Sequence, residues 1–124
     1  MTISQLLNQI GALKPNHFTV PEKVAWMREL DSRFYAEAVL NHEGGDLVVY
    51  EPYQEGTPED TELLIKEPHD GCYLHYLAMQ IDLYNMEIHK YNNSKEIFDQ
   101  LYAQAAAAYT REHMPLRRVS HLKL

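Results

Sequence analysis

The sequence predicts a mainly α-helical fold, a small helical bundle built on a long antiparallel αα-hairpin. Two segments, at about 69–91 and 94–114, carry apolar residues three and four positions apart, a spacing that places them on one face of a helix. Only Asn92, Asn93 and Ser94 separate the two segments, which leaves room for no more than a tight reversal. A further helix at about 20–42 is expected to pack on this hairpin.

Each hairpin segment has its own apolar stripe. The first consists of Tyr73, Leu77, Ile81, Tyr84, Ile88 and Tyr91, and the second of Ile97, Phe98, Leu101, Tyr102, Ala105, Ala106 and Tyr109. Asn93 stands three residues before Glu96, which is capping-box spacing and predicts that the second helix begins there. The alanines at 105–108 are interpreted as a site of close helix packing.

Two helices are expected before the hairpin. Thr2 can cap a short helix that ends near Leu13, because a proline follows shortly after. Thr19 and Glu22 have capping-box spacing and predict the start of the helix at about 20–42. The buried stripe of that helix would be Val24, Met27, Leu30, Phe34 and Ala38, with Trp26 beside it.

The segment at 44–57 interrupts the helical pattern. Residues 47–50 form a short β-prone run inside a stretch rich in Gly, Pro, Glu and Asp. Such a run cannot form a stable sheet alone, so it either pairs with the C-terminal segment 119–124 or is an exposed loop that finds a partner in another chain. A short helix is then expected at 57–65, and Pro115 begins an extended C-terminal tail at 115–124.

Bulk properties describe one small domain. The chain has 124 residues, of which 45% are hydrophobic and 23% charged, proportions typical of a soluble globular protein. No apolar run is long enough to span a bilayer and no signal peptide opens the chain, so we expect no membrane partner. The single cysteine, Cys72, excludes an internal disulfide.

The charge is unevenly distributed along the chain. The net charge of −7 argues against a general nucleic-acid binder, which needs a basic surface. Residues 111–124 hold four basic and one acidic residue, a balance of +3, so the rest of the chain carries −10. A basic tail on an acidic body could dock on a neighbouring copy, although a solvated tail explains the charge equally well.

Residue patterns for catalysis or metal binding are weak. None of the seven histidines has a carboxylate three residues before it, which excludes the Glu-x-x-His motif of di-iron bundles. Cys72 and His75 are one helical turn apart and could share a metal or form a nucleophile pair. Since neither a second ligand pair nor an orienting group accompanies them, a buried structural thiol is the preferred interpretation. We therefore predict no catalytic residue, cofactor or metal.

The candidate interaction residues lie in the loop and in the tail. Two of the nine tyrosines stand in the acidic 44–57 loop, and tyrosine is favoured at interfaces because it combines a large ring with a polar tip. A loop folded back on its own body is the equally weighted alternative. The predicted contact residues are Val48, Tyr50 and Tyr53 in the loop and Arg117, Arg118, Val119, Leu122 and Leu124 in the tail.

Several stretches of the hairpin resemble a group of phage proteins. They are Pro68–Leu77 (PHDGCYLHYL), Ile81–Glu87 (IDLYNME), Tyr91-Asn92-Asn93, Phe98, Tyr102, Tyr109 and Arg111–Pro115 (REHMP). This string resembles the head–tail connector, or adaptor, proteins encoded among the structural genes of tailed phages and prophages of Gram-positive bacteria. The resemblance covers roughly residues 60–115 well and the N-terminal third loosely, and it is weakest at 44–57.

The resemblance implies a non-enzymatic virion protein without a cofactor. Copies of the chain would form a homo-oligomeric ring at the head–tail interface, with the portal protein on one side and tail-side connector proteins on the other. DNA would pass through the ring without sequence-specific binding. The net charge of −7, in addition, predicts an acidic lumen that would repel the DNA. The 44–57 loop and the tail would serve as interaction extensions.

Two other functions are left open. One is a small acidic helical binding or regulatory module of prophage origin that docks to a host or phage protein; its mark would be a stable monomer with an exposed apolar groove. The other is an enzyme built around Cys72 and His75. A DNA-binding helix-turn-helix is disfavoured, because neither hairpin helix carries a basic recognition face.

Overall fold

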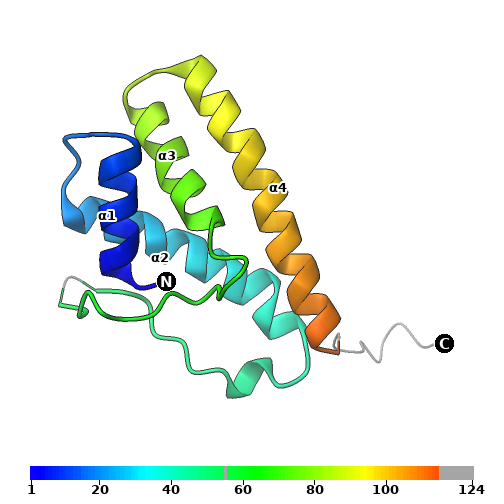
Figure 1. Ribbon diagram of the computed structural model, residues 1–124. Helices are drawn as coiled ribbons and strands as arrows, with labels where there is room; N and C mark the ends of the chain where they lie inside the picture. The colour runs from blue at the N-terminus through cyan, green and yellow to red at the C-terminus, as the bar shows by residue number, and fades with distance from the viewer. Residues whose placement is uncertain (55, 115–124) are drawn as a thin grey trace.

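The protein is a bundle of four α-helices, as the sequence predicts. The computed structural model describes residues 1–54 and 56–114. The helices are α1 (Ile3–Leu13), α2 (Val20–Glu37), α3 (Cys72–Tyr84) and α4 (Ile88–Glu112), with two 3₁₀-helices, η1 (Val39–Asn41) and η2 (Gly45–Leu47), after α2. Figure 1 shows α3 and α4 as an antiparallel pair, with α1 beside α3 and α2 crossing the bundle. Within the described residues no strand forms, and the mainly α prediction is confirmed.

The first two helices begin where their caps predict. The side chain of Thr2 accepts a hydrogen bond from the backbone N–H of Gln5, and the side chain of Gln5 accepts one in return. Thr19 and Glu22 make the same reciprocal pair at the start of α2. Each pair satisfies two N–H groups that a helix start would otherwise leave without partners, which is why these boundaries can be predicted from the sequence.

The predicted position of the hairpin turn is wrong. The chain reverses at 85–87, so Asn92, Asn93 and Ser94 lie inside α4 and Asn93 is no cap. The turn holds together through local hydrogen bonds, in which Met86 N–H donates to Leu83 O and Glu87 N–H donates to Asp82 O. Met86 takes the left-handed conformation there, with φ 58°.

Tertiary contacts explain this shift of the turn. Ser94 donates a hydrogen bond to the buried carboxylate of Asp82 across the hairpin, at 2.9 Å, so it bridges the two helices. Lys14 reaches the same carboxylate at 2.7 Å from the α1–α2 connection. Polar residues inside a helix lower its stability by only a few tenths of a kcal/mol each, which these contacts offset. Tyr84 and Ile88, assigned to the buried stripe, are exposed beside the turn.

The predicted helix at 57–65 does not form. Thr61 N–H donates to Pro58 O in a turn, and the residues that follow run beside the N-terminus of the chain. Leu63 N–H donates to Met1 O at 2.9 Å, and Ile3 N–H donates to Thr61 O at 3.1 Å. Leu63 and Ile65 are both buried in this extended arrangement. Pairing with the N-terminal residues thus satisfies the backbone groups that a helix would have satisfied internally.

The end of α2 depends on a glycine. The helix ends at Glu37, η1 continues it to Asn41, and the chain then turns at Gly44, whose φ is 79°. A Cβ on Gly45 would lie 1.9 Å from the carbonyl oxygen of Val39, so only glycine fits against η1. This contact places the 44–54 segment along the lower end of α2, at the opposite end of the molecule from the α3–α4 turn (Figure 1).

All four helices contribute to one hydrophobic core. Its fully buried members include Leu6 and Ile10 of α1, Met27 and Leu30 of α2, Leu77 and Ile81 of α3, and Phe98 of α4. The Tyr76 and Phe98 rings, whose centroids are 5.0 Å apart, pack α3 on α4. Of the helices in residues 1–54 and 56–114, none is both long and apolar enough to cross a membrane.

Candidate functional site

The predicted contact residues of the loop lie in different surroundings. Tyr53 is only 4% exposed, and its hydroxyl donates a hydrogen bond to the buried carboxylate of Asp31 in α2. The prediction of Tyr53 as a surface contact is therefore wrong, because the loop folds back on α2 there. The Arg28 guanidinium also donates a hydrogen bond to Tyr53 O, at 3.0 Å, and so holds the loop against α2 at this residue.

Asp31 is the hub that holds this part of the chain in place. Besides Tyr53, it accepts hydrogen bonds from the Tyr73 hydroxyl of α3 and from Leu64 N–H. Burial raises the pKa of Asp31, while the three donors favour its ionised form. One carboxylate thus joins α2, α3 and the segments at 53 and 64.

Val48 and Tyr50 remain accessible and line a groove. Tyr50 stacks on Tyr35 of α2 with ring centroids 4.8 Å apart, and its hydroxyl lies 2.8 Å from the hydroxyl of Ser32. Val48 is half-buried, whereas the neighbouring Val49 is 87% exposed. The contact roles of Val48 and Tyr50 stay predictions. The predicted tail residues Arg117, Arg118, Val119, Leu122 and Leu124, and the pairing of 119–124 with the loop, lie outside the described residues.

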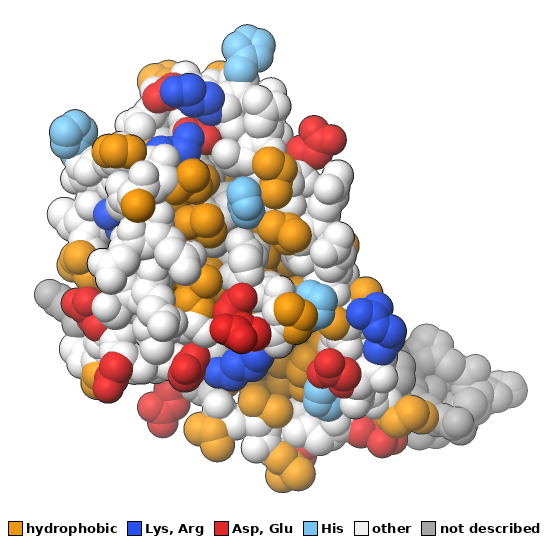
Figure 2. Space-filling view, in the orientation of Figure 1, with side chains coloured by type: hydrophobic (Ala, Val, Ile, Leu, Met, Phe, Trp, Pro, Cys, Tyr) orange, Lys and Arg blue, Asp and Glu red, His pale blue; other side chains and the backbone are white. Residues whose placement is uncertain are grey.

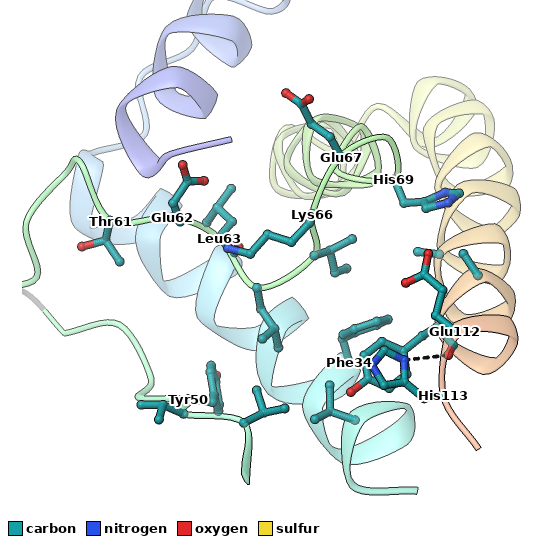
Figure 3. Close-up of a pocket in the computed structure, with 18 of the residues that line it drawn as sticks. Phe34, Tyr50, Thr61, Glu62, Leu63, Lys66, Glu67, His69, Glu112 and His113 are labelled. Atoms are coloured by element: carbon teal, nitrogen blue, oxygen red, sulfur yellow. Dashed lines mark hydrogen bonds between the residues drawn. The ribbon is translucent and has the colours of Figure 1, made fainter. Parts of the chain in front are cut away.

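The groove is a preformed apolar cavity of about 620 Å³, a size usual for binding sites. Its walls come from four parts of the fold: the end of α2 with η1, the segment at 48–53, the segment at 61–69 and the last turns of α4. The residues that line it are Phe34, Val39, Val48, Val49, Tyr50, Glu51, Tyr53, Thr61, Glu62, Leu63, Leu64, Ile65, Lys66, Glu67, His69, Ala105, Ala108, Tyr109, Glu112 and His113. Figure 3 shows Glu67 and His69 on one side, Glu112 and His113 on the α4 side, and Tyr50 at the far end.

Two alanines of α4 form part of the groove wall. Ala105 and Ala108 are buried and line the groove opposite the 61–69 segment. The alanine run interpreted from the sequence as close helix packing therefore also borders the groove. Sequence analysis missed the 61–69 wall as well, since it assigned those residues to a helix.

The rim of the groove is acidic. Glu51, Glu62, Glu67 and Glu112 are all exposed there, and Lys66 is the one lysine or arginine among the lining residues. Glu62 is paired with the α-amino group of Met1 at 3.2 Å, whereas the other three glutamates make no ion pair with any described residue. Figure 2 shows hydrophobic side chains running down this face, with acidic side chains and histidines around them.

A cluster of aromatic rings closes the α4 end of the groove. The Tyr109 and His113 rings stack with centroids 3.9 Å apart, and Phe34 meets Tyr109 edge-on at 5.7 Å. His113 Nδ1 lies 3.0 Å from Tyr109 O, the hydrogen bond drawn in Figure 3. His42 packs against Tyr109 and lies 3.2 Å from the Thr110 hydroxyl, which ties η1 to α4. These contacts hold η1 and the last turns of α4 together at this end of the groove.

The Cys72 thiol is poorly placed for chemistry. It is fully buried, and burial, together with the charges of Asp31 and Asp70, raises its pKa to about 12. Burial also lowers the pKa of His75, so a thiolate–imidazolium pair is disfavoured at neutral pH. Among residues 1–54 and 56–114 no group of three His, Cys, Asp or Glu side chains is arranged to hold a metal ion.

No protein-family model matches this chain, and neither the curated proteins nor the solved structures include a significant match. The class that fold and site define is thus a small all-α bundle with an apolar, acidic-rimmed groove.

Proposed function

We propose that this protein is a head–tail connector of a tailed phage or prophage, a non-enzymatic structural protein of the virion. Copies would assemble side by side into a ring between the portal protein and the tail-side connector proteins, and DNA would pass through it without sequence-specific binding. The resemblance of residues 60–115 to such connectors supports this assignment, as does the small helical protomer.

The observation that carries the proposal is the apolar tip of the hairpin. Leu83, Tyr84, Met86 and Ile88 cluster at the α3–α4 turn, and their exposed fractions are 42%, 62%, 83% and 56%. Exposed apolar groups of this size in one short stretch are typical of a contact surface. In a ring of parallel copies every tip lies on the same rim, where it can meet a second ring.

The experiment measures the mass of the full-length protein by light scattering over a wide concentration range, alone and with the portal protein encoded nearby. We expect closed oligomers, either spontaneous or formed on the portal. The double variant Met86→Glu/Ile88→Glu should keep self-association and lose the partner ring. His89→Glu adds negative charge at an exposed site in the first turn of α4 and should retain both self-association and the partner ring.

A small acidic binding module is the second candidate. The groove favours it, because a single copy already presents an open apolar site. A protein that stays monomeric at every concentration, and that does not bind the portal, would overturn the connector proposal and support this one.

A further inference from the structure

We propose that the groove binds residues 115–124 of a second copy of this chain, in an extended conformation. This inference names the contact through which copies of the chain would associate. It rests on the proposed self-association only where it assigns the segment to another copy. Three features of the groove support this inference: an apolar floor, an acidic rim, and a run of backbone N–H groups that have no acceptor among the described residues.

The floor of the groove requires apolar side chains. Phe34, Val39, Leu63 and Ile65 are buried around it, and Ala105 and Ala108 leave it open on the α4 side. The cavity of about 620 Å³ is preformed and too large for a single methyl or isopropyl group. An occupant that places several aliphatic groups here would gain about 25 cal/mol for each Å² of apolar surface removed from water.

The rim requires an occupant with positive charge. Four glutamates and one lysine give the lining a balance of −3 with histidines neutral. Glu51, Glu67 and Glu112 face solvent and pair with no described cation. Complementary charge steers an encounter and selects against acidic partners, so a basic segment is favoured over a neutral one.

The C-terminal segment has both properties. Residues 115–124, PLRRVSHLKL, contain three basic and no acidic side chains. Alternate residues of an extended chain share a face, so Leu116, Leu122 and Leu124 would point one way together with Arg118, while Arg117 and Lys123 would point the other way together with Val119. Three leucines would therefore face the apolar floor, and two basic side chains would face the acidic rim.

The backbone beside the groove can pair with an extended segment. The N–H groups of Val49, Tyr50 and Glu51 donate to no residue in the described part of the chain. Val48 already has an extended conformation, with φ −76° and ψ 121°. A peptide laid along 48–51 can therefore add hydrogen bonds of the strand type while its side chains enter the groove.

The geometry at the end of α4 assigns the segment to a second copy. Met114 O accepts a hydrogen bond from Glu43 N–H at 2.7 Å, which holds the chain against the η1–η2 connection. To enter its own groove the chain would have to reverse over His113, and a four-residue turn would use 115–118. Ten extended residues reach about 33 Å, enough to cross to an adjacent protomer.

The first test is charge reversal in the full-length protein, read as mass against concentration. Arg117→Glu/Lys123→Glu should raise the concentration needed for self-association at least tenfold, and so should Glu51→Arg/Glu67→Arg/Glu112→Arg. An equimolar mixture of the two variants should associate, because the acidic groove of the first binds the basic segment of the second and the reversed groove of the second binds the reversed segment of the first. A single chain carrying all five changes should recover the wild-type mass. Glu59→Arg/Asp60→Arg, at exposed sites outside the groove, is the matched control.

The second test is cross-linking, which separates the possible occupants. One copy carries Val49→Cys and the other Leu124→Cys, and a flexible bis-maleimide joins them; Cys72 is buried and should not react. A cross-linked pair of different copies is the expected product. Cross-links that form only within a single chain carrying both changes would overturn the proposal, and so would the absence of any cross-link. Binding of an unrelated basic peptide with the same affinity as a peptide of residues 115–124 would overturn it too.

The two proposals fail separately. Rings whose mass is unchanged by the charge reversals would support the connector proposal and contradict the groove contact. Cross-linked pairs without rings or portal binding would support the groove contact and contradict the connector proposal.

Discussion

The hydroxyl of Tyr73 in α3 donates a hydrogen bond to the carboxylate of Asp31 in α2, and both side chains are fully buried. The same Tyr73 oxygen accepts from Ile65 N–H at 2.7 Å, so one hydroxyl links the carboxylate to the 61–69 wall of the groove. The groove therefore depends on a polar hub in the core as well as on apolar packing.

Removing the hub carboxylate should destabilise the protein. Asp31→Ala leaves two tyrosine hydroxyls and Leu64 N–H without their acceptor, and we expect unfolding free energy to fall by about 2–4 kcal/mol. Urea denaturation measures the change. Tyr73→Phe removes one of these bonds and the acceptor of Ile65 N–H, but Asp31 keeps its two other donors, so the free energy of unfolding should fall by less. Ser32→Ala, on the exposed side of α2, should change it by under about 0.5 kcal/mol. Equal losses for Asp31→Ala and Ser32→Ala would argue against the hub.

The position of the hairpin turn can be tested at Asn93. This residue is exposed inside α4, where alanine is the better helix former, so Asn93→Ala should raise stability by about 0.5 kcal/mol. If Asn93 were a cap, the same change would lower stability by about 1 kcal/mol. The sign of the shift in the urea midpoint decides between the two.

A control for the turn is available at Met86. Its φ of 58° is unfavourable for a residue with a Cβ, by about 1–2 kcal/mol. Met86→Gly should therefore raise stability or leave it unchanged, despite the greater freedom that glycine gives the unfolded chain. A clear loss would place the turn elsewhere.

Two glycines should respond to alanine in opposite directions. Gly45→Ala puts a Cβ against Val39 O and should lower stability by several kcal/mol or prevent folding. Gly11 lies within α1 with open space around it, so Gly11→Ala should raise stability by about 0.8–1 kcal/mol. Thermal unfolding followed by circular dichroism measures both, and similar effects at the two sites would contradict the close approach at Gly45.

Alkaline titration should reveal the buried tyrosines. Burial and the Asp31 charge raise the pKa values of Tyr53 and Tyr73, and burial and Glu37 raise that of Tyr102. A raised pKa means that the folded state holds the proton more tightly, so this stability is complete below the ordinary value of about 10 and is lost as the pH rises above it.

Absorbance at 295 nm measures tyrosinate, and circular dichroism measures folding over the same range. We expect part of the absorbance change to coincide with unfolding, and Tyr73→Phe to make that part smaller. Ionisation of all nine tyrosines in the folded state would contradict their burial.

The thiol of Cys72 should resist modification. With its pKa raised to about 12 by burial, it holds almost no thiolate at pH 8, and the side chain has no exposed surface. A colorimetric disulfide reagent should react with less than one-tenth of the folded protein in the time that it labels the urea-unfolded chain completely. Rapid reaction of the folded protein would instead reopen the nucleophile hypothesis.

Local patterns sufficed to predict the helical class and the starts of α1 and α2. Thr2 and Thr19 make the predicted caps, because a cap needs only residues a few positions away. The apolar spacing in α2 likewise places Met27, Leu30 and Phe34 in the core. The fold class could be predicted for the same reason, since each amphipathic face must be covered by another.

The site depended on contacts between distant residues. The hairpin turns at 85–87 because Asp82 binds both Lys14 and Ser94, and no local pattern contains that triad. Tyr53 is buried because Asp31, 22 positions earlier, accepts its hydroxyl.

The sequence by itself determined the helical class, the caps of α1 and α2, and the separation of a basic C-terminal segment from an acidic body. Only the tertiary structure decided that 61–65 lies extended against the N-terminus and that Ala105 and Ala108 leave a cavity beside it. The physical reason is that capping and amphipathic spacing are set within one or two helical turns. A groove is instead the space that four separate segments fail to fill, and its existence depends on how they pack together.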